Sequence, residues 1–171
     1  MKSDNQNNTL KMLMRYKIWA DDITYKSALE LPENEITKIR KTNFKTIIHT
    51  LNHIYVVEDI FKSHLSGSKH NYTARNTVDV PNLKLLYSRV QDMNEWYMHL
   101  VEKSSADELS EIIKFDFVGG GKGEMSREEI ILHIANHATY HRGFVSDLMY
   151  QIPARMPAND LPVFLRDNWK K

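Results

Sequence analysis

The sequence contains no cysteine among its 171 residues. This absence excludes disulfide bonds, thiolate nucleophiles and cysteine-ligated zinc or iron–sulfur sites, and it leaves histidine, aspartate and glutamate as the side chains able to bind a metal. The chain also lacks an excess of charge of one sign, because 23 basic and 22 acidic residues give a formal net charge of +1. Nucleic-acid binding usually needs a strongly basic surface, so we expect no nucleic-acid partner.

Long hydrophobic runs are absent as well. No stretch approaches the roughly 18 apolar residues of a membrane-spanning helix, and residues 1–9 are polar, unlike a signal sequence. We therefore expect a cytoplasmic protein with no membrane partner. Hydrophobic residues still make up 42% of the chain, which is enough to bury a core, and the length suits a single domain.

Hydrophobic periodicity predicts an all-α fold. Apolar residues recur at intervals of three and four along several long segments, the spacing that places side chains on one face of a helix. Residues that end helices, such as Pro32, Gly67 and Pro153, separate these segments. We expect residues 1–9 to form a flexible tail and residues 10–171 to form one four-helix bundle domain. The expected helices span about 10–31, 42–65, 81–103 and 127–151.

A short extended segment is expected before the last helix. Residues 112–118 alternate in polarity and end in a glycine-rich turn. The triple glycine does not predict a phosphate-binding loop, because Lys122 is followed by Gly123 and not by the serine or threonine of that motif. Ser126 and Glu129 form the pattern of a capping box, which predicts that the last helix begins directly after them.

The last predicted helix carries three histidines spaced four residues apart, His133, His137 and His141. Histidines four apart lie on one helix face and can share a cation, but the outer two of three are about 12 Å apart along the axis and cannot easily do so. On a helical wheel His141 lies within the apolar arc, His137 lies at its edge, and His133 falls to one side. His137 and His141 are therefore the candidate metal ligands.

A third ligand would have to come from another helix. The second predicted helix offers His49 and His53, and we favour His53 because it shares a stripe with apolar residues. Two alternatives stay open: His53 is a buried histidine with a backbone partner, and the last helix is an amphipathic helix that is merely rich in histidine. No glutamate lies between His137 and His141, so the general base of zinc metalloproteases is missing.

Three stretches of the sequence resemble a known family. Residues 137–143, HATYHRG, resemble the H-x-x-x-H-R-G signature of the DinB/YfiT-like proteins, a family of four-helix-bundle metalloenzymes. Residues 16–21, YKIWAD, are similar to the opening of the family's first helix, and residues 51–54, LNHI, resemble its second-helix segment. Residues 158–161, ANDL, also look similar to the family, so the matching stretches are spread along nearly the whole chain and the resemblance extends beyond a single motif.

The resemblance implies a three-histidine site made by His53, His137 and His141, with positions left for water or substrate. Divalent nickel, zinc or iron is the implied metal. The implied fold is an up-down-down-up bundle with a long crossover between the second and third helices. Family members frequently form homodimers, and apolar residues around Trp19 and on the long helices also favour a homodimer here.

The resemblance further implies a small-molecule substrate. Some relatives are thiol S-transferases or isomerases that use a low-molecular-weight thiol, so a metal-dependent transferase or hydrolase is the first hypothesis. With no cysteine in the chain, the sulfur would have to come from such a cofactor. The alternative is a non-catalytic dimeric metal-binding or stress-response bundle. Because free histidine titrates near pH 6.5, we expect metal binding to rise between about pH 5 and 7.

Residues near the predicted ligands have interpretations of their own. Glu58 and Asp59 follow His53 by more than one helical turn and are candidates for carboxylates that orient its imidazole. Arg142 points about 100° away from its neighbouring histidine, so we expect it to pair with a carboxylate on another helix. Gly143 costs about 1 kcal/mol inside a helix compared with alanine, and we expect it to permit close helix packing.

Overall fold

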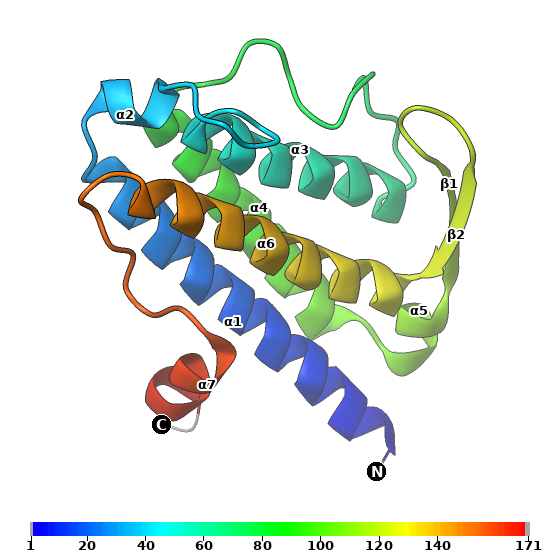
Figure 1. The fold of residues 1–171 in the computed structure, drawn as a ribbon. Coiled ribbons are helices and arrows are strands. Elements are labelled where there is room, and N and C mark those ends of the chain that lie inside the picture. Colours follow the sequence, from blue (N-terminus) through cyan, green and yellow to red (C-terminus); the bar gives the residue numbers. More distant parts are fainter. Residues whose placement is uncertain (1, 170–171) are drawn as a thin grey trace.

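The computed structural model describes residues 2–169, and for residues 2–7 it describes the backbone only. The protein is mostly helical, with a small two-stranded sheet (Figure 1). The long helices are α1 (Lys2–Leu29), α3 (Ile47–Leu65), α4 (Leu83–Lys103) and α6 (Arg127–Tyr150). The shorter elements are α2 (Glu33–Thr37), α5 (Ala106–Ser110), β1 (Ile112–Asp116), β2 (Lys122–Ser126), α7 (Leu161–Phe164) and a π-helical turn (Leu165–Trp169).

The long helices pack side by side. Helix α1 contacts both α4 and α6, and α3 contacts the same two helices. Figure 1 shows α3 and α4 running in the same direction, because the irregular segment 66–82 crosses back along the molecule between them. We call this segment the crossover. Among residues 2–169, no helix is both long enough and apolar enough to cross a lipid bilayer.

Local sequence signals explain several helix ends. The side chain of Ser126 accepts a hydrogen bond from the Glu129 backbone amide and the Glu129 carboxylate accepts one from the Ser126 amide, so the predicted capping box is confirmed. Gly67 follows α3 with a φ of 65°, a conformation that glycine adopts without steric cost. Helix α3 begins later than predicted, because Thr46 provides its N-cap by accepting from the His49 amide.

The first helix begins earlier than predicted. Helix α1 begins at Lys2, so residues 2–9 continue the helix that the sequence analysis starts at residue 10. These residues are polar, but they include neither proline nor glycine, so nothing in the segment breaks a helix. Residue 1 lies outside the described residues.

The predicted extended segment is one half of a β-hairpin. Strand β1 pairs with β2 in antiparallel register, with Phe115 opposite Gly123. A Cβ atom at Gly123 would lie 2.6 Å from the ring of Phe115 and 2.8 Å from that of Phe117, so both aromatic rings pack over the bare glycine backbone. The second strand escapes sequence analysis because its stabilising contacts come from β1 and not from its own pattern.

The core is divided along the helices into two main clusters of buried hydrophobic residues. A third cluster lies on the outer side of α1, where Phe164 of the C-terminal segment packs against Tyr16 and Trp19 at ring-centroid distances of 5.9 and 5.6 Å. The C-terminal segment therefore covers part of the apolar surface around Trp19 from which the sequence predicts a homodimer.

Candidate metal centre

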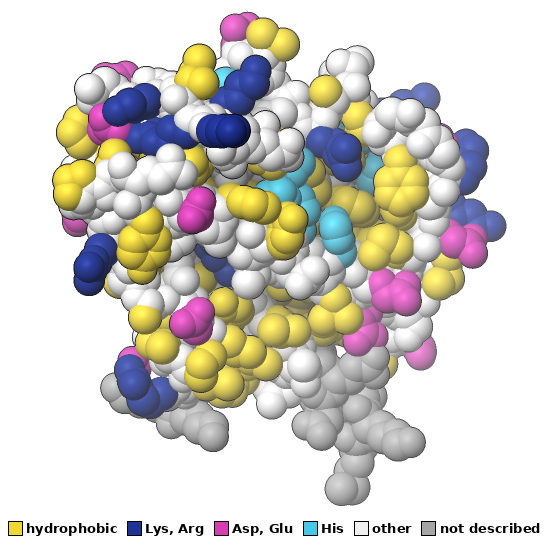
Figure 2. Space-filling model, viewed as in Figure 1, with side chains coloured by type: hydrophobic (Ala, Val, Ile, Leu, Met, Phe, Trp, Pro, Cys, Tyr) yellow, Lys and Arg dark blue, Asp and Glu magenta, His cyan; other side chains and the backbone are white. Residues whose placement is uncertain are grey.

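The structure brings the three predicted ligands together. His53 of α3 and His137 and His141 of α6 each present a ring nitrogen, and these atoms lie within 4.8 Å of one another. His53 and His141 are buried, and His137 is half-buried. Figure 2 shows histidine side chains reaching the surface in a hollow between α3 and α6, beside hydrophobic side chains and a basic one. We call these three residues the histidine cluster.

The arrangement of the cluster fits a shared cation. Nε2 of His53 lies 3.1 Å from Nε2 of His137. Two nitrogens that are each about 2.0–2.1 Å from one ion are separated by about 2.9–3.4 Å, so the observed distance suits two ligands of one metal.

Hydrogen bonding in the cluster leaves lone pairs without donors. Nδ1 of His53 lies 2.6 Å from the backbone carbonyl oxygen of Arg75, which can only accept, so this nitrogen carries the proton and Nε2 of His53 carries a lone pair. His137 can donate one proton to that lone pair, but its own Nδ1 is then an unprotonated, buried nitrogen with no partner among the described residues. Nδ1 of His141 is buried and unpartnered as well. A cation between the Nε2 atoms of His53 and His137 would instead take the lone pairs of both, and each of these two rings would then carry its proton on Nδ1.

Burial keeps the three imidazoles neutral. Desolvation lowers the pKa of His137 to about 2, and the neighbouring histidines add to the effect. Desolvation also lowers the pKa of His141 to about 4 and that of His53 below its ordinary value of 6.5. A neutral imidazole is the form that binds metal, so the cluster is in its ligating state at neutral pH.

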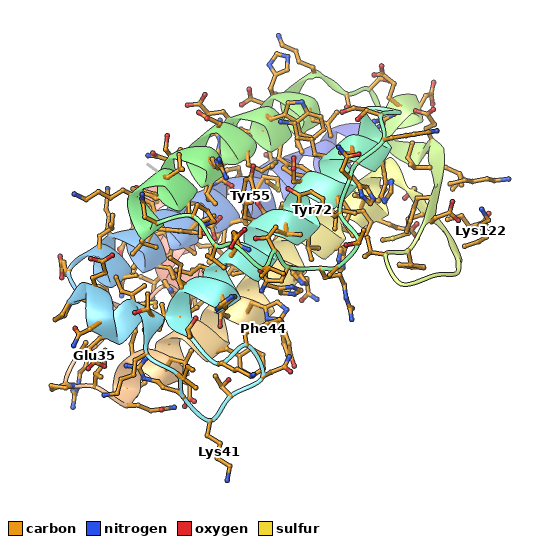
Figure 3. All side chains as sticks on the ribbon, turned by 90° about the horizontal axis from the view of Figure 1, so that it is seen from above. Glu35, Lys41, Phe44, Tyr55, Tyr72 and Lys122 are labelled. Atoms are coloured by element: carbon orange, nitrogen blue, oxygen red, sulfur yellow. The ribbon has the colours of Figure 1, made fainter. Side chains whose placement is uncertain are left out.

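Aromatic side chains border the cluster. Phe44, from the loop before α3, stacks on His53 with ring centroids 4.3 Å apart and presents its face or edge to His141 at 5.4 Å. Figure 3 shows Phe44 on this loop, beside α3 and α6. On α6, Tyr140 lies 5.0 Å and Phe144 5.8 Å from the His141 ring. These rings limit the access of water to one side of the cluster.

His133 and His49 lie outside the cluster. The ring of His133 is 5.4 Å from that of His137 and 5.0 Å from that of Phe61, so it is a neighbour of the cluster on the hairpin side. Nδ1 of His49 contacts Oγ1 of Thr46 at 3.1 Å, at the start of α3. Both placements agree with the sequence analysis, in which the helical wheel set His133 apart and the apolar stripe favoured His53 over His49.

The carboxylates expected to orient His53 do not do so. Glu58 is fully buried and its carboxylate pairs with Lys17 at 2.7 Å, while the Asp59 carboxylate accepts a hydrogen bond from Tyr72 at 2.7 Å. The role predicted for them belongs to the Arg75 carbonyl on the crossover. Sequence reasoning missed this acceptor because a backbone carbonyl on an irregular segment leaves no residue-type signal.

Arg142 makes the predicted pair with a neighbouring helix. Its Nη1 donates to Oδ1 of Asp21 on α1 at 2.8 Å, and its Nη2 donates to Oγ1 of Thr139 at 2.9 Å. Lys17 contacts the other oxygen of Asp21 at 2.8 Å and also Glu58. The spacing of Lys17 and Asp21, four residues apart on a core-facing helix, is a signal that could have found this group. We call Lys17, Asp21, Glu58 and Arg142 the charged cluster.

Gly143 does not have its expected role. A Cβ atom added there would meet nothing within 4 Å, and the residue is exposed, so close helix packing is not what the structure requires of it. Gly143 therefore makes the helix less stable than alanine would, and no closer packing compensates for this.

Comparison with known proteins agrees with the fold and the motifs. The sequence pattern of the DinB family matches residues 3–170. The protein is similar to Protein DinB of Bacillus subtilis (strain 168), with 21% identity over 158 residues that cover 90% of this chain and 91% of that one. It also shares its fold with a DinB-like protein from Bacillus cereus ATCC 10987, at a TM-score of 0.65 and 18% identity over 85% of this chain and 94% of the other. The chain thus belongs to the DinB family.

Proposed function

We propose that this protein is a divalent-metal-dependent enzyme acting on a small molecule, with His53, His137 and His141 as its metal ligands. The observation that carries the proposal is the hydrogen-bond pattern of the cluster. The Arg75 carbonyl fixes the proton of His53 on Nδ1, so that its free nitrogen meets those of two further neutral, buried imidazoles within 4.8 Å. Nickel, zinc and iron all accept imidazole ligands, and each fits this donor set.

In this proposal the histidine ligands and the residues around them have different roles. A divalent cation held by three neutral imidazoles keeps its full charge, which lowers the pKa of a bound water or thiol and polarises a bound carbonyl. The Arg75 carbonyl orients the His53 ring, and burial keeps all three imidazoles unprotonated. Phe44 shields the cluster from bulk water along the faces of His53 and His141.

Transfer of a low-molecular-weight thiol, or hydrolysis, is the reaction we propose. Each needs an activated nucleophile at the centre, and the lack of cysteine means that the nucleophilic sulfur of a thiol transfer must come from a cofactor. We further propose that the four long helices form the up-down-down-up bundle implied by the family. The shared direction of α3 and α4 supports that order.

A homodimer is also part of the proposal. Between α1 and α4 lies a groove of about 630 Å³, whose walls combine Ile18, Trp19, Tyr87 and Met98 with seven polar or charged side chains. This groove is on the side of α1 where the sequence places surplus apolar surface. Sedimentation at high micromolar concentration tests the pairing: a dimer supports it, whereas a species of about 20 kDa alone contradicts it, since stable interfaces bury about 1,000 Å² or more.

Elemental analysis of protein purified without a polyhistidine tag tests the metal site. Retention of one nickel, zinc or iron ion per chain after dialysis supports the proposal, and protein that retains none after incubation with all three contradicts it. Turnover is then measured on loaded protein with a thiol and a chloronitrobenzene, and separately with a nitrophenyl ester. A loaded protein without either activity, matching a His141→Ala variant, would favour the non-catalytic alternative.

A further inference from the structure

A second cavity lies next to the histidine cluster, and neither the metal nor its ligands account for it. Its volume is about 380 Å³, and it lies between α3, the crossover and the β-hairpin. The walls include Val57, Phe61, Phe115 and Phe117, and Arg75 lies at its rim. We call this cavity the hairpin pocket.

The hairpin pocket adjoins the histidine cluster. On α3, His53, Val57 and Phe61 follow one another at intervals of four, so the ligand and the pocket lining lie on one face of the helix. The Phe61 ring is 5.0 Å from that of His133, which in turn is next to His137. Arg75 completes the connection, because its backbone carbonyl holds His53 while its side chain lines the pocket.

The charges around the pocket favour an anion. Arg75 makes no ion pair with any residue in the described part of the chain, yet its charge is close enough to lower the pKa of both His53 and His137. Asp116 also lines the pocket, but its carboxylate pairs with Lys122 at 2.7 Å. The guanidinium of Arg75 is therefore the uncompensated charge at the rim, and its planar fork matches a carboxylate.

The walls of the pocket favour a flat apolar group. Phe61 and Phe117 each pack near-perpendicular to Phe115, with centroids 5.4 and 5.1 Å away, which leaves aromatic faces and edges toward the cavity. Phe117 is half exposed, at 50%, so it can gain buried area when a ligand binds. A volume of about 380 Å³ is at the small end of ligand sites, which suits a molecule with a single ring.

We propose that the hairpin pocket binds a small aromatic carboxylate, with Arg75 pairing with the carboxylate and Phe61, Phe115 and Phe117 enclosing the ring. As a substrate site it rests on the proposed function, because it assumes chemistry at the adjacent histidines. As a binding site it needs no metal. The two can therefore fail separately.

Calorimetric titration with phenylacetate, phenylacetamide and acetate tests the proposal on metal-free and zinc-loaded protein. Phenylacetate is expected to bind both forms, about tenfold more tightly than its neutral amide and well above acetate, because only it offers both the ring and the charge. Its affinity should fall as the salt concentration rises. Equal affinity for the acid and the amide would overturn the assignment of the charge, and equal affinity for acetate would overturn that of the ring.

Matched arginine variants locate the binding site. Arg75→Gln retains the backbone carbonyl that holds His53, and it is expected to reduce phenylacetate affinity to that of the amide. Arg155→Gln removes an equally exposed charge away from the pocket and should leave the affinity unchanged. Phe117→Ala should weaken phenylacetate about tenfold without changing acetate. Binding that requires zinc and ignores Arg75→Gln would place the carboxylate on the metal and overturn the proposal.

Metal analysis of the same samples separates the two proposals. If the wild-type protein holds no metal but phenylacetate binds through Arg75, the proposed function fails and the hairpin pocket stands. If the protein holds one ion per chain but phenylacetate binds no better than its amide, the pocket fails and the metal site stands. Circular dichroism confirms that each variant is folded.

Discussion

Two groups of buried polar side chains lie between the long helices. They differ in whether opposite charges within the group compensate one another. The charged cluster contains two cations, Lys17 and Arg142, and two carboxylates, Asp21 and Glu58, so its formal charges cancel. The histidine cluster contains neutral rings, and Nδ1 of His137 and of His141 has no hydrogen-bond partner among the described residues. The ion pairs of the charged cluster join α1 to α3 and α6, although Oε2 of Glu58 has no hydrogen-bond partner among the described residues. The histidine cluster has no such internal pairing of opposite charges.

Burial shifts pKa values in both clusters through desolvation. It lowers the pKa of each clustered histidine, and it raises the pKa of the Glu58 carboxyl to about 7 against the opposing pull of Lys17. For Lys17, burial alone would lower the pKa, but Asp21 and Glu58 outweigh it and raise it. Desolvation therefore favours the neutral form of each group, and an opposite charge in contact outweighs it for Lys17 but not for Glu58.

The largest effect is expected when one ligand of the histidine cluster is removed. Replacing His137 or His141 with alanine should reduce metal content from about one ion per chain to none, because two imidazoles hold a divalent ion far less well than three. Mass spectrometric metal analysis of tag-free protein measures the loss. His133→Ala and His49→Ala are the matched controls, and both should keep the metal. Full occupancy in the His141 variant would show that the ligands are wrongly assigned.

The next largest effect is expected when a cation of the charged cluster is removed. Lys17→Met should lower the free energy of unfolding by about 3–5 kcal/mol, because it leaves the buried carboxylates of Asp21 and Glu58 without their shared cation. Urea denaturation measures the change. Lys26→Met is the control, since its exposed pair with Asp22 should contribute less than about 1 kcal/mol. A loss of similar size in both variants would mean that the charged cluster is not structural.

The two clusters should also respond to pH in opposite ways. In the unfolded chain the histidines bind protons as the pH falls below about 6.5, while His141 stays neutral down to about 4 in the fold and His137 lower still. The unfolded state therefore holds more protons, and the metal-free protein loses stability as the pH falls from about 6.5 to 4. The raised pKa of Glu58 works the other way, because folding favours its protonated form.

Urea denaturation of metal-free protein at several pH values between about 7 and 4.5 separates these contributions. A His137→Leu variant should lose stability less steeply than the wild type, and a His49→Ala variant should follow the wild type. The lowered pKa values also move the expected metal dissociation below the pH 5–7 range of free histidine, so few protons should be released on metal binding at about pH 6. If the free energy of unfolding changes with pH equally in the wild type and the His137→Leu variant, the buried histidine is not a cause of the loss of stability in acid.

The smallest expected effect concerns Gly143, beside the histidine cluster. Gly143→Ala should raise the free energy of unfolding by about 1 kcal/mol, because the new methyl group meets no neighbour and alanine favours the helix. Gly123→Ala is the contrasting variant: it should destabilise the protein, since its methyl group would collide with Phe115 and Phe117. Thermal unfolding distinguishes the two. A loss of stability on replacing Gly143 would restore a packing role for it.

Much of the fold and the site could be predicted from sequence because the signals are local. The capping box at Ser126 and the spacing of His137 and His141 depend on residues within one or two helical turns. The position of His53 opposite them needed the family resemblance, since its own stripe fits a buried histidine equally well. Phe44 and the Arg75 carbonyl were not predicted, because irregular segments are positioned by the tertiary fold alone.

Non-local pairing explains the remaining differences. Strand β2 has a polar, glycine-containing sequence, and it becomes a strand because the Phe115 ring covers Gly123 from the opposite side. Glu58 was read as a carboxylate near His53, but the helix rotates it toward Lys17 on α1. In both cases the deciding contact joins segments that are distant in sequence, and no periodicity within either segment encodes it.

The placement of the hairpin pocket has a consequence for which parts of the site tolerate substitution. The histidines sit on long helices whose other faces form the core, so substitutions around them are constrained by packing. The remaining lining residues of the pocket come from the crossover and the hairpin turn. Segments of this kind tolerate changes of length and sequence at little cost in stability. Changes of sequence in these two connections would therefore alter the proposed pocket and leave the three histidines on α3 and α6 in place.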